Sequence, residues 1–105
     1  MKLFGLKTCD TCRKAIKSLN NKGLDYVDVR RDGVPDDVLD SAFAQFGLAL
    51  VNKSSTTWRG FSDDEKARDP LELLREHPTL MKRPLIVNDG VMTLGWKKEV
   101  EDQYT

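Results

Sequence analysis

The N-terminal part of the chain combines two short apolar runs with one amphipathic stretch between them. Residues 2–6 are mostly apolar and lead into polar turn residues, which predicts a buried strand. From Cys12 onward the pattern predicts a helix that stops at Lys22 and Gly23, a cation followed by the residue that most often ends helices. The apolar face of this helix carries Ala15, Ile16 and Leu19. Residues 24–29 alternate imperfectly and predict a second strand, so the three elements make a βαβ unit.

The middle of the chain is predicted to be helical. Pro35 stands where a first helical residue is favoured, and Gly47 stands where a helix ends. Between them lies an apolar stripe at helical spacing, formed by Val38, Leu39, Ala42, Phe43 and Phe46. Residues 62–65 have the capping-box form of a helix N-terminus. The pair Asp69-Pro70 suits the cap and first residue of a further helix, which is expected to stop before Pro78.

The clearest local pattern lies near the C-terminus. Residues 85–87 and 91–94 are apolar runs separated by Asn88-Asp89-Gly90, and Asp-Gly supplies the positive φ angles of a tight hairpin turn. A short amphipathic helix is predicted from Trp96, Val100 and Tyr104, which lie four residues apart. The order of elements predicts an α/β fold with a mixed four-stranded sheet and a helical insert between the βαβ unit and the hairpin. We expect a single domain over residues 1–105.

Composition and charge narrow the classes of function. Seventeen Lys and Arg balance seventeen Asp and Glu, so no net positive field draws the chain to nucleic acid or anionic lipid. The apolar runs are too short to span a membrane, and the first residues lack the pattern of a signal peptide, which predicts a cytoplasmic protein. Two cysteines and one histidine are too few for a structural zinc site, so no metal is expected.

The candidate chemistry lies in Cys9-Asp10-Thr11-Cys12, where the first strand gives way to the first helix. The free N–H groups and the dipole at this helix end stabilise an anion, so Cys9 is expected to ionise more readily than an ordinary thiol. Cys12, one helical turn further on, is placed to attack a mixed disulfide at Cys9 and release the reduced product. The alternative is a pair of cysteines that serve only as small hydrophobic residues. The spacing at a strand–helix junction favours redox chemistry.

Five stretches of the chain carry a resemblance to one family. They are residues 8–15 (TCDTCRKA), residues 52–59 (NKSSTTWR), His77-Pro78, residues 82–85 (KRPL) and Leu94-Gly95. In this order and at these separations they resemble the ArsC/Spx family of thioredoxin-fold proteins. The likeness is greatest to the small YffB-type, arsenate-reductase-like members, and it covers nearly the whole chain.

The resemblance implies a thioredoxin-like fold and gives several residues a role. In such a sheet the proline at the place of Pro84 is cis and faces the redox cysteine, and the residues beside it help to hold an extended thiol substrate. Arg83 would supply a fixed positive charge near Cys9 for an oxyanion or a glutathione carboxylate. Arg13, in the first turn of the helix, is a further candidate for the glutathione carboxylates.

Arsenate is expected to be a poor substrate. The arsenate reductases of this family hold the oxyanion beside their redox cysteine with three arginines, and only Arg83 matches one of these. The position of the second arginine corresponds to Asn52 in this chain, and that of the third lies at or beside Trp96. Lys53 and Arg59 are the candidates to replace the missing charge if their loop folds inward. A single arginine offsets the desolvation of a dianion poorly.

The sequence therefore predicts a thiol:disulfide oxidoreductase that works with glutathione or another small thiol and has no tightly bound cofactor. Cys9 would be the nucleophile, and Cys12, which those reductases generally lack, would be the resolving thiol. A glutaredoxin is a candidate partner. Glutathione-linked arsenate reduction is one alternative. The other is a redox-sensing regulator of the Spx kind, which binds the RNA polymerase α subunit rather than DNA.

Overall fold

A computed structural model describes residues 1–104 of the chain, which group into two compact units. One unit combines Met1–Asp32 with the chain from Arg83 onward, so two segments distant in sequence build it together. The other unit is the inserted segment Gly33–Lys82. This insert corresponds to the helical middle expected from the sequence, while the single domain over residues 1–105 stays a prediction.

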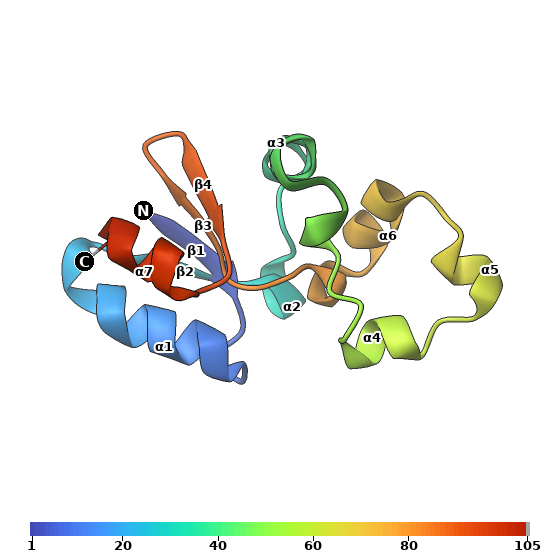
Figure 1. The fold of residues 1–105 in the computed structure, drawn as a ribbon, viewed down its shortest axis with the longest axis horizontal. Coiled ribbons are helices and arrows are strands. Elements are labelled where there is room, and N and C mark those ends of the chain that lie inside the picture. Colours follow the sequence, from blue (N-terminus) through green and yellow to red (C-terminus); the bar gives the residue numbers. More distant parts are fainter. Residues whose placement is uncertain (105) are drawn as a thin grey trace. The chain divides into compact units, whose positions relative to one another are not determined.

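The first unit is built on a mixed four-stranded sheet (Figure 1). Its strands, in the spatial order β2-β1-β3-β4, are β1 (Lys2–Gly5), β2 (Asp25–Asp28), β3 (Leu85–Asn88) and β4 (Val91–Leu94). β1 runs parallel to β2, as a βαβ unit requires, and antiparallel to β3. The hairpin between β3 and β4 turns at Asp89 and Gly90, whose φ angles of 50° and 79° are those of a tight turn. The predicted mixed α/β sheet is confirmed.

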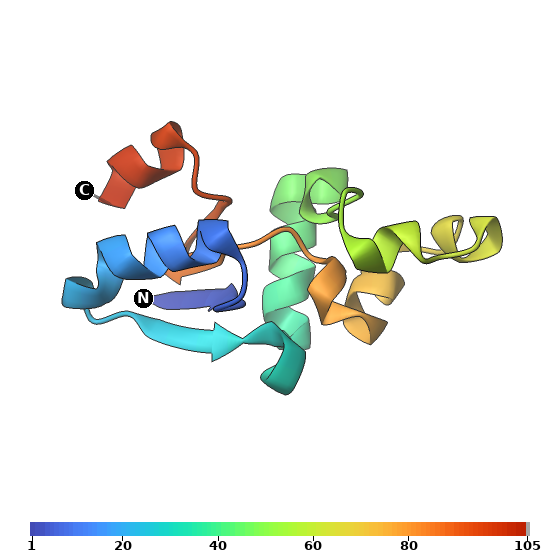
Figure 2. The same ribbon diagram turned by 90° about the horizontal axis from the view of Figure 1, so that it is seen from below.

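Two helices cover one face of this sheet (Figures 1 and 2), namely α1 (Asp10–Leu19) and α7 (Lys98–Tyr104). The register places Leu3 beside Ile86, so the two side chains project from the same face. The fully buried cluster beneath the helices consists of Leu3, Ala15, Leu19 and Ile86. Thr93 follows in the same row, and its hydroxyl lies 2.8 Å from that of Tyr104. This hydrogen bond fastens α7 to β4.

The insert has a core of its own, formed around short helices. They are α3 (Asp36–Phe46), α4 (Thr56–Arg59), α5 (Asp63–Lys66) and α6 (Pro70–Glu76). α3 packs against α6, which buries Leu39 on the first helix and Leu73 on the second. An ion pair of 2.5 Å between Arg75 and Asp40 joins the same two helices. In residues 1–104, no helix combines the length and apolar character needed to cross a membrane.

Several expected helix ends of the insert are confirmed. α3 ends before Gly47, which begins a 3-10 turn, η2 (Gly47–Leu50). The N–H of Glu65 donates to the Ser62 hydroxyl at 3.2 Å, and the Glu65 carboxylate reaches back, which completes the capping box. α6 stops at Glu76, and Pro78 opens a second 3-10 turn, η3 (Pro78–Leu80).

The second strand differs from the expectation at its C-terminal end. The pattern predicts a strand over residues 24–29, but β2 stops at Asp28, and Val29 begins a one-turn helix, α2 (Val29–Asp32). The cause is local, because the Asp28 carboxylate accepts hydrogen bonds from the N–H groups of Arg30 and Arg31 at 2.9 and 3.1 Å. A side chain that caps a turn has ended the strand.

The first and last helices also differ in extent from the expectation. α1 begins at Asp10 rather than at Cys12, and its α-helical part stops at Leu19. Residues Asn20–Lys22 form a 3-10 turn, η1, before Gly23 takes the left-handed conformation that ends it. The C-terminal helix begins at Lys98, so Trp96 precedes it and contributes to the core from the connecting segment.

Candidate active site

Cys9 caps the N-terminus of α1 shortly after the end of β1. Its backbone is extended, with φ −88° and ψ 123°, and its carbonyl accepts the first helical hydrogen bond from the Arg13 N–H at 2.9 Å. The Cys9 N–H donates to the Leu6 carbonyl at 3.1 Å, which closes the turn between strand and helix. At this position a side chain meets the free N–H groups of the first helical turn. The fold therefore places the Cys9 thiol where a helix favours negative charge.

The pKa of Cys9 lies below that of an ordinary thiol. Partial burial raises this pKa, but the backbone N–H of Cys12, the thiol of Cys12 and the backbone N–H of Thr11 lower it further than burial raises it. The positive charge of Arg83 lowers the pKa as well. Each of these groups stabilises the thiolate over the neutral thiol. The direction agrees with the expectation from the sequence.

Cys12 has the opposite tendency. Burial, followed by the charge of Cys9 and the hydrogen bond with its sulfur, raises the pKa of Cys12 to about 12, although the Leu6 N–H and Arg83 lower it. Cys9 is half-buried and Cys12 fully buried, and both are free thiols. Near neutral pH the pair therefore combines an accessible sulfur that ionises readily with a buried sulfur that keeps its proton.

The sequence did not indicate two further residues that shape this site. A Cβ added at Gly5 would lie only 2.7 Å from the Cys12 Sγ, so the absence of a side chain at the end of β1 makes room for that sulfur. On β2, the Tyr26 hydroxyl accepts a hydrogen bond from the Lys7 N–H at 3.0 Å and holds the turn that leads to Cys9. Glycine also occurs in strands at bulges and bends, and tyrosine is common in strands of every kind, so neither residue could be identified from the pattern alone.

The Arg83–Pro84 peptide bond is cis, as expected from the resemblance. Pro84 is buried directly before β3, and its carbonyl accepts a hydrogen bond from the Gly95 N–H at 2.9 Å, which extends the ladder between β3 and β4. Arg83 is part of the same unit as the two cysteines and acts on the pKa of both. The structure thus brings Arg83 together with Cys9 and Cys12.

Of the other predicted site residues, Arg13, Asn52 and Lys53 have local partners of their own. Arg13 forms an ion pair with Asp10 on the exposed side of α1. Asn52, Lys53 and Arg59 belong to the insert. The Asn52 side chain accepts a hydrogen bond from the Ser54 N–H at 3.1 Å, while the Lys53 ammonium lies 5.6 Å from the centre of the Trp58 ring. Arg59 is an exposed residue of α4. Within residues 1–104, no cluster of three or more His, Cys, Asp or Glu side chains could hold a metal ion.

Alkylation of the two thiols should distinguish them in the native protein. We expect the rate at which iodoacetamide modifies Cys9 to rise with pH and then level off. It should level off at a lower pH than the rate for a free cysteine, whose pKa is about 8.5. Cys12 should react only in denaturant, because it is buried and its pKa is raised to about 12. Peptide mass spectrometry of samples quenched over a pH series measures both rates, and equal rates at the two thiols would contradict the assignment.

The sheet order, the CxxC sequence at the strand–helix junction and the cis proline define a protein with a thioredoxin-like fold. The chain belongs to the ArsC family, whose family model matches residues 4–103. An uncharacterised protein of Haemophilus influenzae is 40% identical over 106 residues, which cover 92% of this chain and 91% of that protein.

Solved structures agree with this family. A protein named YffB has a TM-score of 0.89 at 27% identity, with 98% of this chain and 96% of that chain covered. A possible arsenate reductase from Streptococcus mutans has a TM-score of 0.76 at 25% identity, with 97% and 95% covered. The resemblance to the ArsC family and to YffB-type proteins is confirmed.

Proposed function

We propose that the chain is a thiol:disulfide oxidoreductase that reduces glutathione mixed disulfides. The observation that carries this proposal is the placement of two free thiols, with Cys9 half-buried at the N-terminus of α1 and Cys12 buried one turn further on. The lowered pKa of Cys9 and the raised pKa of Cys12 agree with this placement. Membership in the ArsC family, and the likeness to a protein described as a possible arsenate reductase, support a reductase of this class. No tightly bound cofactor is needed, because the two sulfurs carry the electrons.

The reaction would proceed through two exchanges of disulfide bonds. The Cys9 thiolate attacks the glutathione sulfur of the substrate, the substrate S–S bond breaks, and the substrate leaves as a thiolate that takes a proton from water. Cys12 then loses its proton and attacks the Cys9 sulfur, which forms the Cys9–Cys12 disulfide and releases glutathione with that proton. The two cysteines have given up two electrons. Free glutathione or a glutaredoxin would return them.

The first exchange would itself activate Cys12. In the free protein, the charge of Cys9 and the hydrogen bond with its sulfur add to burial in raising the pKa of Cys12. When Cys9 is held in a mixed disulfide, its charge is gone, while the Leu6 N–H and Arg83 still favour the Cys12 thiolate. The resolving thiol would therefore stay protonated until the substrate has reacted.

Substrate binding would use the groups around Cys9. Arg83 supplies a positive charge for a glutathione carboxylate, and the chain beside Pro84 is the expected place for the glutathione main chain. Arg13 is a weaker candidate, since its guanidinium already pairs with Asp10. Lys14, the exposed residue that follows Arg13 on α1, is an alternative partner for the second carboxylate of glutathione.

Comparison of arsenate with a glutathionylated peptide tests this function. With glutathione, glutathione reductase and NADPH, we expect the peptide to be reduced rapidly and arsenate to give little NADPH oxidation above the blank. The reason is that a compact dianion needs several fixed donors to offset its desolvation, and only Arg83 matches the family's arginines. NADPH absorbance gives both rates, and robust arsenate turnover would show that the protein is an arsenate reductase instead.

The competing function is a redox switch that binds the RNA polymerase α subunit. The same pair of free thiols favours it as a second candidate, because their oxidation to a disulfide would change the end of α1. Co-purification of the tagged chain with the α subunit, combined with absence of turnover in the NADPH assay, would support the switch. Turnover without co-purification would support the reductase.

A further inference from the structure

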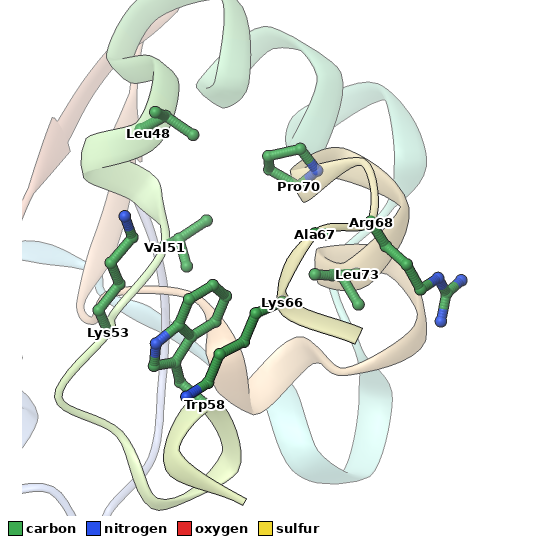
Figure 3. A pocket seen from close by; sticks show the side chains of 9 residues that line it. All are labelled: Leu48, Val51, Lys53, Trp58, Lys66, Ala67, Arg68, Pro70 and Leu73. Carbon is green, nitrogen blue, oxygen red and sulfur yellow. The ribbon is translucent and has the colours of Figure 1, made fainter. Parts of the chain in front are cut away.

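The insert contains an apolar pocket that the redox chemistry does not use. Its volume is about 290 Å³, and all the residues that line it belong to Gly33–Lys82 (Figure 3). Leu48 and Val51 form one wall, and Pro70 and Leu73 form the wall that faces them across the cavity. The indole of Trp58 lies at the end of the cavity between these walls. Leu48 is 59% exposed, so this wall of the pocket is open to solvent.

Two lysines border this apolar cavity, with their ammonium groups on opposite sides of the Trp58 indole (Figure 3). The ammonium groups of Lys53 and Lys66 lie 5.6 and 5.7 Å from the centre of the Trp58 ring, and both side chains line the pocket. Within the part of the chain that the structure describes, neither ammonium forms an ion pair with a carboxylate. The Trp58 ring is their partner, and this contact is worth about 0.5–1 kcal/mol at an exposed site.

Arg68, the third cation at the pocket, is already neutralised. Its guanidinium points away from the cavity (Figure 3) and pairs with Glu72 at 2.5 Å and with Glu76 at 2.6 Å. The nearby carboxylate of Glu65 is held in the capping box with Ser62. The uncompensated charge of the pocket therefore comes from Lys53 and Lys66.

We propose that this pocket binds a small carboxylic acid with a flat apolar body, such as an aryl-substituted short-chain acid. The body would lie against Trp58 between the walls of Val51 and Leu73, and the carboxylate would take a hydrogen bond from Lys53 or, on the other side of the indole, from Lys66. Charge-assisted hydrogen bonds of this kind are stronger than the contacts that the ammonium groups make with the indole.

Size and polarity select this class of ligand over others. Pockets for small molecules usually measure roughly 300–1,000 Å³, and this cavity of about 290 Å³ lies at the lower end, which suits a ligand of few atoms. A compact inorganic dianion would lose its hydration against the apolar walls without enough donors to replace it. A neutral hydrocarbon would fill the cavity but leave both ammonium groups without an anionic partner. A carboxylate joined to an aromatic ring can contact the apolar walls and pair with a lysine ammonium group.

Matched probes test the proposal directly. We expect 3-phenylpropionate to shift the Trp58 indole N–H signal in ¹H–¹⁵N NMR spectra in a saturable way. It should bind about tenfold more tightly than the neutral 3-phenylpropionamide, because only the acid can form a charge-assisted hydrogen bond with a lysine at the pocket. Propionate, which lacks the ring, should bind about tenfold more weakly than 3-phenylpropionate as well. The chain has two tryptophans, and a Trp96→Phe variant assigns their signals.

Lysine variants then locate the binding site. The double substitution Lys53→Gln and Lys66→Gln should remove the preference for the acid over the amide, while Lys22→Gln, an exposed lysine of the other unit, should leave it unchanged. Equal binding of acid and amide to the unaltered chain would overturn the proposal, and so would a preference that survives the double substitution. Absence of a saturable shift at Trp58 would overturn it too. Cys9→Ser should bind the acid normally, so the result is independent of the proposed redox function.

Discussion

A Cys12→Ser variant exposed to a glutathionylated peptide should accumulate one glutathione on Cys9, whereas a Cys9→Ser variant should carry none and show no turnover. The first exchange needs only the Cys9 thiolate, which the N–H groups of Cys12 and Thr11 and the charge of Arg83 still stabilise in the Cys12→Ser variant. The second exchange needs a sulfur at residue 12, so the adduct has no internal route to resolution. Intact-protein mass spectrometry after an acid quench detects the adduct, and peptide mapping assigns it to Cys9.

Serine is a suitable replacement at residue 12 because it is smaller than cysteine and its hydroxyl can still donate to the Cys9 sulfur. The unaltered chain serves as the positive control and should show the Cys9–Cys12 disulfide instead of an adduct under the same conditions. Glutathione found on residue 12 in the Cys9→Ser variant would reverse the two roles. Full NADPH-coupled turnover by Cys9→Ser would remove the dithiol from the mechanism altogether. Loss of turnover in Cys9→Ser is expected to be at least several hundredfold, since no other thiol is accessible.

The elements that the sequence predicted well are those with local causes. The hairpin turn follows from Asp89 and Gly90, which can take positive φ angles, and the structure shows φ of 50° and 79° there. The capping box at Ser62 and the stop before Pro78 depend on neighbours within a few residues, and both were found where the pattern placed them. Turns and helix ends of this kind can be predicted from the sequence because all the interacting groups lie within one short stretch.

The errors have a common physical origin in contacts that side-chain periodicity does not encode. Val29 continues the apolar alternation of β2, yet the Asp28 carboxylate binds the N–H groups of the next turn and starts α2. The one-turn helix α4 is too short to show a helical period, although Ser55 caps it through a hydrogen bond from the Trp58 N–H at 3.1 Å.

In the candidate site, too, residues with local causes could be predicted from the sequence, and residues that depend on contacts outside the local pattern could not. Cys9 and Cys12 were recognised because spacing within one helix turn carries their chemistry. The sequence offers Lys53 as a replacement for a missing arginine, and only the structure shows its ammonium group near the Trp58 ring. Gly5 depends on a contact with Cys12 across the strand–helix turn, and no pattern in one sequence reveals such a contact.

Gly5→Ala should therefore disturb the redox site through packing alone. The added Cβ would lie 2.7 Å from the Cys12 Sγ and 3.1 Å from the Leu3 Cδ2, and both neighbours are fully buried. One of them must shift, and overpacking of this kind costs about 1–3 kcal/mol of the free energy of unfolding. Displacement of Cys12 would weaken the hydrogen bond from its thiol to Cys9, which lowers the pKa of Cys9 in the native chain. The pKa of Cys9 should therefore rise.

Urea denaturation and the pH dependence of Cys9 alkylation measure the two effects. Gly60→Ala is a matched control in the other unit, because its added Cβ would meet the nearest atom, the Thr56 carbonyl oxygen, at 3.4 Å. A double-mutant cycle identifies the cause, since Cys12→Ala removes the sulfur and leaves the Cys12 Cβ at 3.5 Å from the new methyl group. In that background Gly5→Ala should lose much of its cost. An equal cost with and without the Cys12 sulfur would mean that Gly5 does not serve to accommodate the resolving thiol.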